Sequence, residues 1–273
     1  MVTKKTWPKY CRFRKSVGDT YAYEIIMPID NTLFYSDNLL PSGQKWSLSF
    51  ERAETKFSTL VTSSNADVSS VPKVLPLDDV YLMIPYTFDD KMKKREANWI
   101  NKPIPLNYDK YQLQRYSLES GSNYIRIPNI INGKLPKILF YGIMTDKSYF
   151  GSFNESSTLF QRHDLIEVDL LKNGSSVPGM PIKMTESYVT IPYVRFLELS
   201  GKFLEKNTTS VMNLQQFNDY HFLQCATFPD DSTASISLEF SFSTNVPDGL
   251  ILVLFSIYDV KMEIDKFGNF TTN

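Results

Sequence analysis

One stretch near the C-terminus decides the fold of this chain. It reads Ser-Ile-Ser-Leu-Glu-Phe-Ser-Phe over residues 235–242, and after a polar turn it continues as Leu-Ile-Leu-Val-Leu-Phe-Ser-Ile-Tyr-Asp-Val-Lys-Met-Glu-Ile over residues 250–264. In the first part polar and apolar residues alternate strictly, so that one face carries Ile236, Leu238, Phe240 and Phe242. Alternation with a period of two predicts a strand with one buried face. The turn ends in Pro247-Asp248-Gly249, residues that typically end one strand before the next begins.

The second part of the stretch predicts a long strand whose surroundings change along its length. Residues Leu250–Phe255 are apolar on both faces, so we expect both faces to be buried. From Ile257 onward polar and apolar residues alternate again. A strand of this kind suits the middle of a β-sandwich, and we expect Leu252 and Leu254 to lie in its core.

The rest of the chain contains further strand patterns separated by residues that favour turns. Besides the stretch above, strands are predicted for Tyr21–Met27, Trp46–Phe50, Lys56–Val61, Val80–Pro85, Tyr111–Tyr116, Asn123–Ile127, Lys137–Met144, Asp164–Leu171 and Tyr220–Phe228. A tight turn is predicted at Lys172–Ser175 and a linker at Thr62–Pro76. Tyr193–Phe203 is the one segment predicted to be a helix. The predicted fold is all-β: an antiparallel β-sandwich of jelly-roll type with long loops and one short helix.

Composition restricts the class of protein more than its function. The 273 residues carry 29 Lys and Arg against 30 Asp and Glu, so the net charge of -1 offers no whole-chain attraction for nucleic acid. Cys11 and Cys225 cannot form a disulfide framework, which favours a reducing compartment. No apolar run is long enough for a membrane span, and Met1–Lys15 lacks the apolar core of a signal peptide.

The N-terminus is locally basic, unlike the chain as a whole. Residues 1–20 contain Lys4, Lys5, Lys9, Arg12, Arg14 and Lys15, with Trp7, Tyr10 and Phe13 between them. We interpret this segment as a basic N-terminal arm. A solvated terminal arm is one interpretation, and an arm that binds a neighbouring subunit or nucleic acid is the other.

Candidate catalytic and metal-binding residues are few and do not follow a known spacing. The histidines are His163 and His221, and neither lies in a recognised catalytic pattern. The cysteines and histidines lack metal-ligand spacing, and no glycine-rich phosphate loop is present. The acidic pairs Asp78-Asp79, Asp89-Asp90 and Asp230-Asp231 could serve glycoside hydrolysis, but each lies beside a turn or strand end, where Asp is expected. We predict no catalytic residues, no metal and no cofactor.

Aromatic residues are abundant and leave two interpretations open. Several lie in or near predicted loops, namely Tyr108, Tyr111, Tyr116, Tyr124, Tyr149 and Phe150. A sugar-binding platform would use such rings on one exposed face. Core packing and subunit contacts are the commoner use.

Four stretches, taken in order, resemble a known family. They are Leu33–Gly43 running into Lys45–Phe50 and Arg52; Leu135–Ile138 with Tyr141–Met144; Phe150–Ser152 followed by Val168–Gly174 and Val177-Pro178; and Val260–Lys266 with Asn269. In order and approximate spacing they resemble the double jelly-roll major capsid proteins of Polinton (Maverick) elements and adintovirus-like viruses. Each stretch alone is only a strand edge and a turn.

The resemblance implies a structural subunit of a viral or virus-derived icosahedral capsid, assembled inside the host cell and located in the virion. It implies other capsid subunits as partners and no catalytic residues. The alternative function is a carbohydrate-binding β-sandwich module. Contact with nucleic acid stays open.

The resemblance also implies a division of the chain. Residues 21–54 are similar to the last strands of a preceding jelly roll, residues 55–265 to the second jelly roll, and residues 266–273 form a C-terminal tail. A second jelly-roll protein is therefore an expected partner that completes the N-terminal strands. Half of a split capsid pair, a captured capsid gene and a single-jelly-roll derivative all fit this division.

Overall fold

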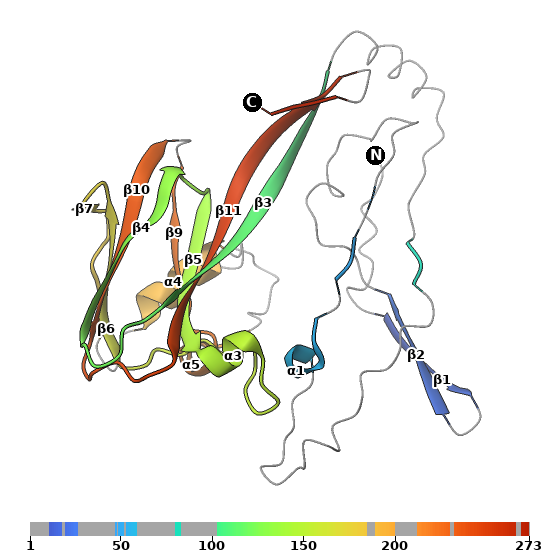
Figure 1. Cartoon of the computed structure of the whole chain (residues 1–273), viewed down its shortest axis with the longest axis horizontal. Coiled ribbons are helices and arrows are strands. Elements are labelled where there is room, and N and C mark those ends of the chain that lie inside the picture. The colour runs from blue at the N-terminus through green and yellow to red at the C-terminus, as the bar shows by residue number, and fades with distance from the viewer. Residues whose placement is uncertain are drawn as a thin grey trace. The chain divides into compact units, whose positions relative to one another are not determined.

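The computed structural model describes residues 11–17, 20–26, 47, 49–51, 53–58, 80–82, 103–184, 189–199, 212–229, 232–265 and 269–272. The chain divides into two compact units. One comprises Met1–Gln44, Asp89–Asp109 and Val260–Asn273, and the other comprises Lys45–Phe88 and Lys110–Asp259. The main hydrophobic core lies in the second unit, between the sheets drawn in Figure 1.

Two five-stranded sheets form the sandwich. The first contains β4 (Tyr124–Lys134), β10 (Thr233–Phe242) and β6 (Leu165–Lys172), with β7 (Ser175–Ser176) and β8 (Ile182–Lys183) both pairing with β6. The second contains β12 (Phe270–Thr272), β11 (Leu250–Ile264), β5 (Ile138–Thr145) and β9 (Gln224–Thr227), with β3 (Ile104–Ser117) pairing with β11.

Strand pairing in these sheets is nested. From the ends of the series inward, β3 pairs with β11, β4 with β10, β5 with β9 and β6 with β8. The outermost pair joins the strands farthest apart in sequence, and successive pairs fall alternately in the two sheets. This winding of eight strands is a jelly roll. The all-β prediction is confirmed.

Strand β10 places the apolar residues of the alternating stretch in the core between the sheets. Ile236, Leu238 and Phe240 are each at most 1% exposed, whereas Ser235, Glu239 and Ser241 on the other face are partly exposed and Ser237 is 9% exposed. β10 lies between β4 and β6 (Figure 1), so its apolar face meets the facing sheet along its whole length. The predicted core residues of this strand are confirmed.

Strand β11 is buried on both faces over its first half, as predicted. Leu250, Leu252 and Leu254 join the main core. On the opposite face Ile251 and Val253 form a second cluster with Met144, against which Tyr149 and Phe160 pack. These two aromatic residues belong to α3 (Asp146–Phe150) and the loop that follows it. The outer face of this sheet is therefore covered locally by a segment expected to be only a loop.

A close crossing over β5 depends on the glycine at position 142. A Cβ atom there would lie 2.7 Å from Leu223 Cδ2, 2.8 Å from Phe160 Cδ1 and 3.1 Å from the Phe222 carbonyl oxygen. The absence of a side chain thus lets the loop at Phe160 and the chain before β9 lie directly on the sheet.

We expect Gly142→Ala to lower the free energy of unfolding by about 1–3 kcal/mol, because one methyl group overpacks this crossing. Chemical denaturation, monitored by circular dichroism, measures the change. Adding Leu223→Ala to Gly142→Ala removes the nearest contact, so the double variant should lose less than the sum of the two single changes. Unchanged stability of the single variant would mean that Phe160 and Leu223 move aside at no cost.

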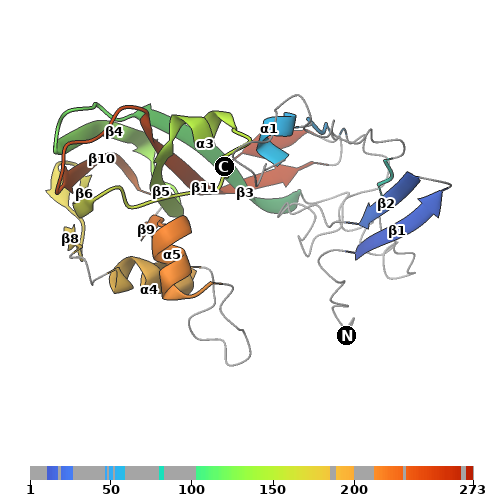
Figure 2. The same ribbon diagram turned by 90° about the horizontal axis from the view of Figure 1, so that it is seen from below.

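Helices α4 (Thr190–Leu199) and α5 (Leu214–Tyr220) lie together beside β9 (Figure 2). Helix α5 begins at a capping box, in which the Asn213 side chain accepts from the Gln216 amide at 2.8 Å and the Gln216 side chain accepts from the Asn213 amide at 3.0 Å. With 10 residues α4 is the longest described helix, and no described helix has the length and apolar character of a membrane span.

Several predicted elements differ from the structure. Four short helices occur among the described residues, not one. Tyr220–Phe228 is not one strand: α5 extends to Tyr220 because its capping box starts a helix, and only Gln224–Thr227 pairs in a sheet. The helix predicted at Tyr193–Phe203 starts earlier, at Thr190, since Pro192 is tolerated in a first turn; residues 200–203 lie outside the described part.

Three strand predictions in the first third of the chain are wrong where they can be compared. Helix α1 (Thr55–Ser58) occupies the start of the segment Lys56–Val61. Ser47, Ser49 and Phe50 in one predicted strand, and Val80–Leu82 in another, belong to no strand. A strand needs a neighbour for its backbone groups, and no described strand pairs with these segments. The remaining residues of all three segments lie outside the described part, as does the linker Thr62–Pro76.

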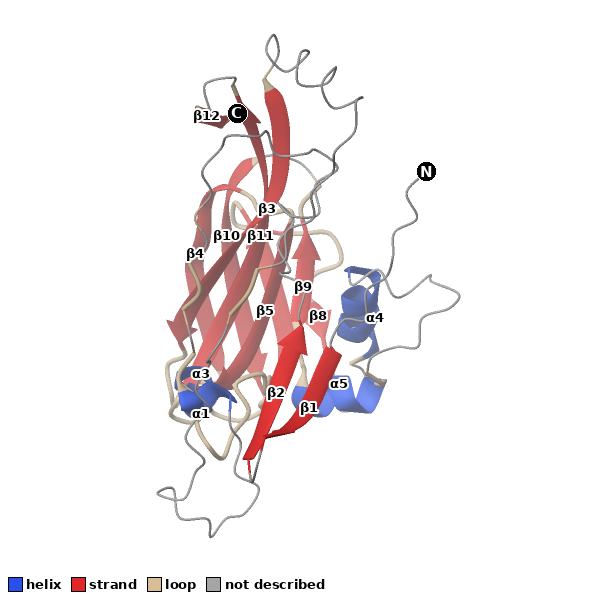
Figure 3. Ribbon diagram, turned by 90° about the vertical axis from the view of Figure 1, so that its right-hand side faces the viewer, coloured by secondary structure: helices blue, strands red, loops and turns tan. Residues whose placement is uncertain are grey.

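The N-terminal segment contains a hairpin. Strand β1 (Cys11–Val17) pairs antiparallel with β2 (Thr20–Ile26), with Cys11 opposite Ile26 and Val17 opposite Thr20 (Figure 3). The strand predicted at Tyr21–Met27 is confirmed for Tyr21–Ile26, and Cys11–Val17, part of the segment interpreted as a basic arm, forms the strand that pairs with it. Two residues, Gly18-Asp19, separate the strands, which is a hairpin signal that the charge pattern obscured.

Two further turns can be compared with the predictions. The tight turn after β6 is confirmed, since Asn173 and Gly174 both have positive φ, at 53° and 83°, as a type I′ hairpin turn requires. The C-terminal tail is not featureless: β12 pairs with the end of β11, with Met262 opposite Thr272.

Candidate functional site

The two histidine-containing segments meet at one surface hollow. Phe160 and His221 form a parallel bridge, in which the Phe160 amide donates to the Tyr220 carbonyl at 3.0 Å and the Phe222 amide to the Phe160 carbonyl at 3.0 Å. The hollow beside this bridge has a volume of about 480 Å³ and is lined by Gln161, Arg162, His163, Asp164, Asn218, Asp219 and Tyr220. His221 itself is not in its lining. Residues about 55 positions apart in sequence therefore share one polar surface.

His163 enters the hollow from a strained turn. His163 and Asp164 are consecutive non-glycine residues in the left-handed region, with φ of 50° and 60°. The turn is held by the loop after β10, because the Ser243 amide donates to the Asp164 carbonyl at 2.9 Å and the Thr244 hydroxyl to the Asp164 carboxylate at 3.0 Å. Burial lowers the pKa of His163, and the neighbouring Asp164 opposes this shift. The ring is therefore neutral at neutral pH.

Among the described residues, the surroundings of His163 do not provide a catalytic triad of nucleophile, base and acid. Its Nε2 atom is buried and has no hydrogen-bond partner in the described part of the chain, whereas a catalytic base needs one bond to a nucleophile and another to an orienting acid. The pairs Asp78-Asp79, Asp89-Asp90 and Asp230-Asp231 lie outside the described residues. An absence of catalysis stays a prediction.

The described residues give little support for metal binding or for thiol chemistry. No group of three or more His, Cys, Asp or Glu side chains is placed there to hold a metal ion. Cys225 on β9 is a thiol only 2% exposed, and burial raises its pKa to about 12. It is therefore a protonated core residue at neutral pH and a poor nucleophile. The side chain of Cys11 is outside the described residues.

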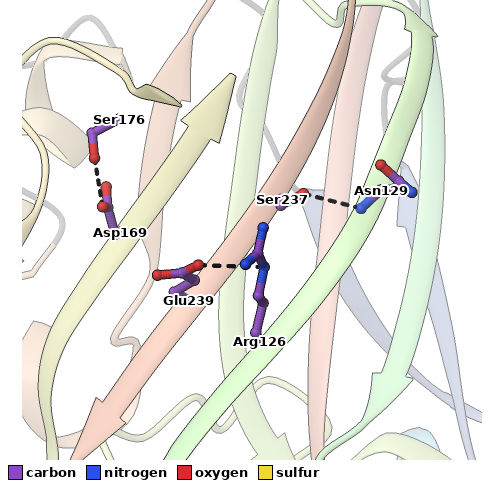
Figure 4. A network of polar contacts seen from close by, with 6 residues as sticks. All are labelled: Arg126, Asn129, Asp169, Ser176, Ser237 and Glu239. Atoms are coloured by element: carbon purple, nitrogen blue, oxygen red, sulfur yellow. Dashed lines mark hydrogen bonds and ion pairs between the residues drawn. The ribbon is translucent and has the colours of Figure 1, made fainter. Parts of the chain in front are cut away.

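The outer face of the first sheet carries a row of polar side chains across three strands (Figure 4). Glu239 on β10 lies opposite Arg126 on β4 and Asp169 on β6. Arg126 Nε lies 3.3 Å from Glu239 Oε1, and the Ser176 hydroxyl donates to Asp169 at 2.6 Å. The Arg126 side chain is 55% exposed, so the ion pair adds at most about 1 kcal/mol. This row keeps strands in register rather than forming a reactive site.

A bulge in β4 belongs to the same face. Between Ile127 and Ile131 the strand contains two more residues than the facing segment of β10. Asn129 adopts a positive φ of 52° there, and its amide donates to the Ser237 hydroxyl at 3.2 Å (Figure 4). A short asparagine side chain tolerates this backbone conformation. The bulge therefore bends β4 locally.

Aromatic and apolar side chains gather on the outer face of the second sheet. The Tyr111 ring on β3 stacks on Phe255 of β11 at 5.7 Å between centroids, and Phe140 of β5 lies 6.4 Å from Phe255. Tyr111 is 45% exposed and Leu113, two residues along β3, is 57% exposed. We call Tyr111, Leu113, Phe140 and Phe255 the β3 apolar face. Nearby, the Arg115 guanidinium lies 4.7 Å from the ring centre of Phe150.

The six aromatic residues considered from the sequence do not form one platform. Tyr108, Tyr111 and Tyr116 lie in β3 rather than in a loop, and Tyr149 and Phe150 lie in α3. Tyr116 packs against the core and its hydroxyl donates to the Ile130 carbonyl at 3.3 Å. Tyr124 lies on the other sheet, in β4. The sequence missed Leu113, Phe140 and Phe255 as their surface partners, because pairing across β3, β11 and β5 brings them together.

No protein-family model matches the chain, and no curated protein matches its sequence. Among solved structures, the chain is similar to a chain of the PBCV-1 virus capsid, with a TM-score of 0.38 and 11% identity over 67% of this chain and 54% of that one. It is similar to PBCV-1 VP54, fitted into a reconstruction of the virophage Sputnik, with a TM-score of 0.40 and 8% identity over the same shares.

A third similar structure is that of the Sputnik virophage, with a TM-score of 0.38 and 7% identity over 63% of this chain and 39% of that one. The matched region thus spans about half or less of the solved chains. The assignment of the jelly-roll fold follows from the strand pairing of the chain itself.

Proposed function

We propose that this protein is a structural subunit of a viral or virus-derived icosahedral capsid. The observation that carries the proposal is the complete nested pairing of eight strands, from β3–β11 to β6–β8. Jelly rolls of this winding are common in viral shells. The relation to the major capsid proteins of Polinton elements and adintovirus-like viruses is part of the proposal, supported by the four colinear stretches of the sequence.

The β3 apolar face is the surface we propose for subunit contact. Leu113 and Tyr111 expose about half of their side chains beside a ring stack, and large aromatic and aliphatic side chains of this kind supply the binding energy of protein interfaces. The polar outer face of the first sheet lacks such a cluster among its described residues. A subunit that works by assembly needs this kind of surface and no reactive centre.

We expect the full chain to form oligomers at micromolar concentration and Leu113→Asp to weaken that association at least tenfold, because a carboxylate would be buried at the contact. Gln112→Asp is the matched control: it adds the same charge one residue away, on the opposite side of the strand. Sedimentation velocity over a concentration series, with negative-stain microscopy of the products, measures both. A full chain that stays monomeric at every concentration would contradict the assembly function.

We also propose that residues 21–54 meet a second jelly-roll protein, as the resemblance implies. The hairpin β1–β2 falls outside the unit that contains the main core of the sandwich, and two strands alone are marginal in water. A jelly-roll gene in the neighbouring reading frame would identify the partner. In that case the chain is one half of a split capsid pair.

Deleting residues 1–52 is expected to leave a folded and more soluble domain, since the sandwich core is built from residues beyond position 105. Circular dichroism should show the same β-rich spectrum for the full chain and the deletion, and light scattering should show less association for the deletion. If the deletion unfolds while the full chain is a clean monomer, the segment belongs to the chain's own core and the partner does not exist.

A further inference from the structure

The hairpin β1–β2 places residues of different chemistry on its two faces. Residues directly opposite each other in an antiparallel pair lie on the same face, and alternate residues of a strand share that face. Three cross-strand pairs occupy one face of the ribbon: Arg12 with Ile25, Arg14 with Tyr23, and Ser16 with Tyr21. We call these six positions the Arg–Tyr face.

The opposite face of the ribbon is mostly apolar. It carries four cross-strand pairs: Cys11 with Ile26, Phe13 with Glu24, Lys15 with Ala22, and Val17 with Thr20. Antiparallel ribbons commonly bury one face and leave the other in water, and burial selects apolar residues. The apolar face is thus the one suited to the protein partner proposed above, which leaves the Arg–Tyr face for a ligand of another kind.

Charge indicates the chemistry of that ligand. Both arginines of the hairpin fall on the Arg–Tyr face, where none of the six positions is acidic, whereas Lys15 shares its face with Glu24. The surrounding segment is strongly basic, because residues 1–20 carry six Lys and Arg against one Asp, although the whole chain has a net charge of -1. A guanidinium group binds two oxygens of one phosphate at once. The face therefore favours a phosphate-bearing ligand.

The spacing of the arginines suits a chain of phosphates. Arg12 and Arg14 occupy alternate positions of β1. Alternate positions of a strand are about 7 Å apart, which is comparable to the distance between successive phosphates of an extended single-stranded nucleic acid. Two neighbouring phosphates can therefore meet the two arginine positions in turn.

The aromatic residues narrow the ligand class further. Tyr21 and Tyr23 occupy alternate positions of β2, opposite Ser16 and Arg14. Unpaired bases stack on aromatic rings, and rings combined with arginine bind single strands with little sequence preference. The bases of a duplex already stack on one another, so they cannot use such a platform.

We propose that the Arg–Tyr face binds single-stranded nucleic acid, with phosphates at Arg12 and Arg14 and bases at Tyr21 and Tyr23. DNA and RNA share this chemistry, and the experiment below distinguishes them. The inference goes beyond the proposed role in assembly and does not depend on it, because the β3 apolar face belongs to other strands.

Fluorescence anisotropy on the full chain tests the proposal, with labelled oligothymidine and oligouridine of about 20 nucleotides, longer than usual single-strand sites. A DNA duplex of the same length is the third probe. In about 50 mM salt, Arg14→Gln should weaken binding about tenfold and lower the slope of log affinity against log salt by about 0.7, because one phosphate contact is lost. Tyr23→Leu should weaken binding about fivefold or more, because one stacked base is lost.

Each variant has a matched control on the opposite face. Lys15→Gln removes the same charge from the adjacent residue, and Phe13→Leu replaces an aromatic residue of the same ribbon. Both controls should bind as the unmodified chain does. Circular dichroism and thermal unfolding of every variant confirm that it is folded before affinities are compared.

Tighter binding of either single strand than of the duplex, weakened in Arg14→Gln and Tyr23→Leu but kept in both controls, supports the proposal. The two single-stranded probes then show whether DNA or RNA is preferred. Equal losses in Arg14→Gln and Lys15→Gln overturn it, since net charge rather than the face would decide binding. Absence of binding to both single strands, or equal affinity for the duplex, also overturns it. A chain that assembles without binding either strand would leave the capsid proposal standing.

Discussion

Replacing Phe240 with alanine is expected to lower the free energy of unfolding by about 3–5 kcal/mol, which is the usual cost of emptying a buried phenylalanine site. Phe240 is 1% exposed and lies two residues before the end of β10. Its neighbours across the strand are Ile125 on β4 and Val168 on β6, and its ring lies 6.5 Å from that of Phe242. Close-packed surroundings on all sides cannot collapse fully into the cavity, which adds to the lost burial.

The measurement is urea denaturation followed by circular dichroism and by fluorescence. Because folded domains are stable by only about 5–15 kcal/mol, Phe240→Leu should be measured as well, as a milder change that keeps the variant folded. Ser241→Ala, one residue away on the outer face, is the control and should change stability by less than about 0.5 kcal/mol. Equal, small effects of Phe240→Ala and Ser241→Ala would contradict the placement of Phe240 between the sheets.

Replacing Phe217 with alanine is expected to lower the free energy of unfolding by a similar amount, about 3–5 kcal/mol. The loss of stability should affect a different part of the molecule. Phe217 on α5 is fully buried and contacts the rings of Tyr193 and Phe196 on α4, at 5.4 and 5.5 Å, and of Phe222 before β9, at 5.8 Å. It links α5 to α4 and, through Phe222, to the chain before β9. Its removal should release the helices from β9.

Hydrogen exchange distinguishes this outcome from that of Phe240→Ala. In Phe217→Ala the amides of α4 and α5 should exchange faster while those of β10 stay protected, because local openings draw on local packing. In Phe240→Ala the strands of both sheets should exchange faster. Gln215→Ala, exposed on the same helix, is the control. Uniform acceleration throughout the sandwich in Phe217→Ala would show that the helices are not a separate unit of stability.

Sequence patterns alone predicted the main strands and the core face of the second half of the chain. Strict alternation in residues 235–242 and the doubly apolar run at 250–255 predicted which side chains lie between the sheets, because a strand's side chains alternate between its faces and burial selects apolar ones. The same signal located β5 and β6 to within a residue or two. Turn chemistry at Asn173-Gly174 was equally readable, since positive φ at both positions strongly favours these residues.

The sequence pattern of a segment did not predict its secondary structure where that structure depends on pairing with another segment. Cys11–Val17 pairs with β2 although its basic residues resemble a solvated arm, and Val80–Leu82 is in no strand although its residues suit one. Strand propensity reflects fit to a partner surface more than a backbone preference, so sequence alone overrates isolated alternation and overlooks charged edge strands.

The surfaces of functional interest were decided by the tertiary structure alone. The jelly-roll winding brings His163 and Asn218 to the lining of one hollow and stacks Tyr111 on Phe255, and nothing in the spacing of these residues predicts either arrangement. Such contacts depend on long-range pairing of strands, whose partners a single sequence does not name. The amino-acid sequence thus specified which faces are buried, whereas the fold decided which exposed side chains come together, because exposed positions carry no periodic signal of their partners.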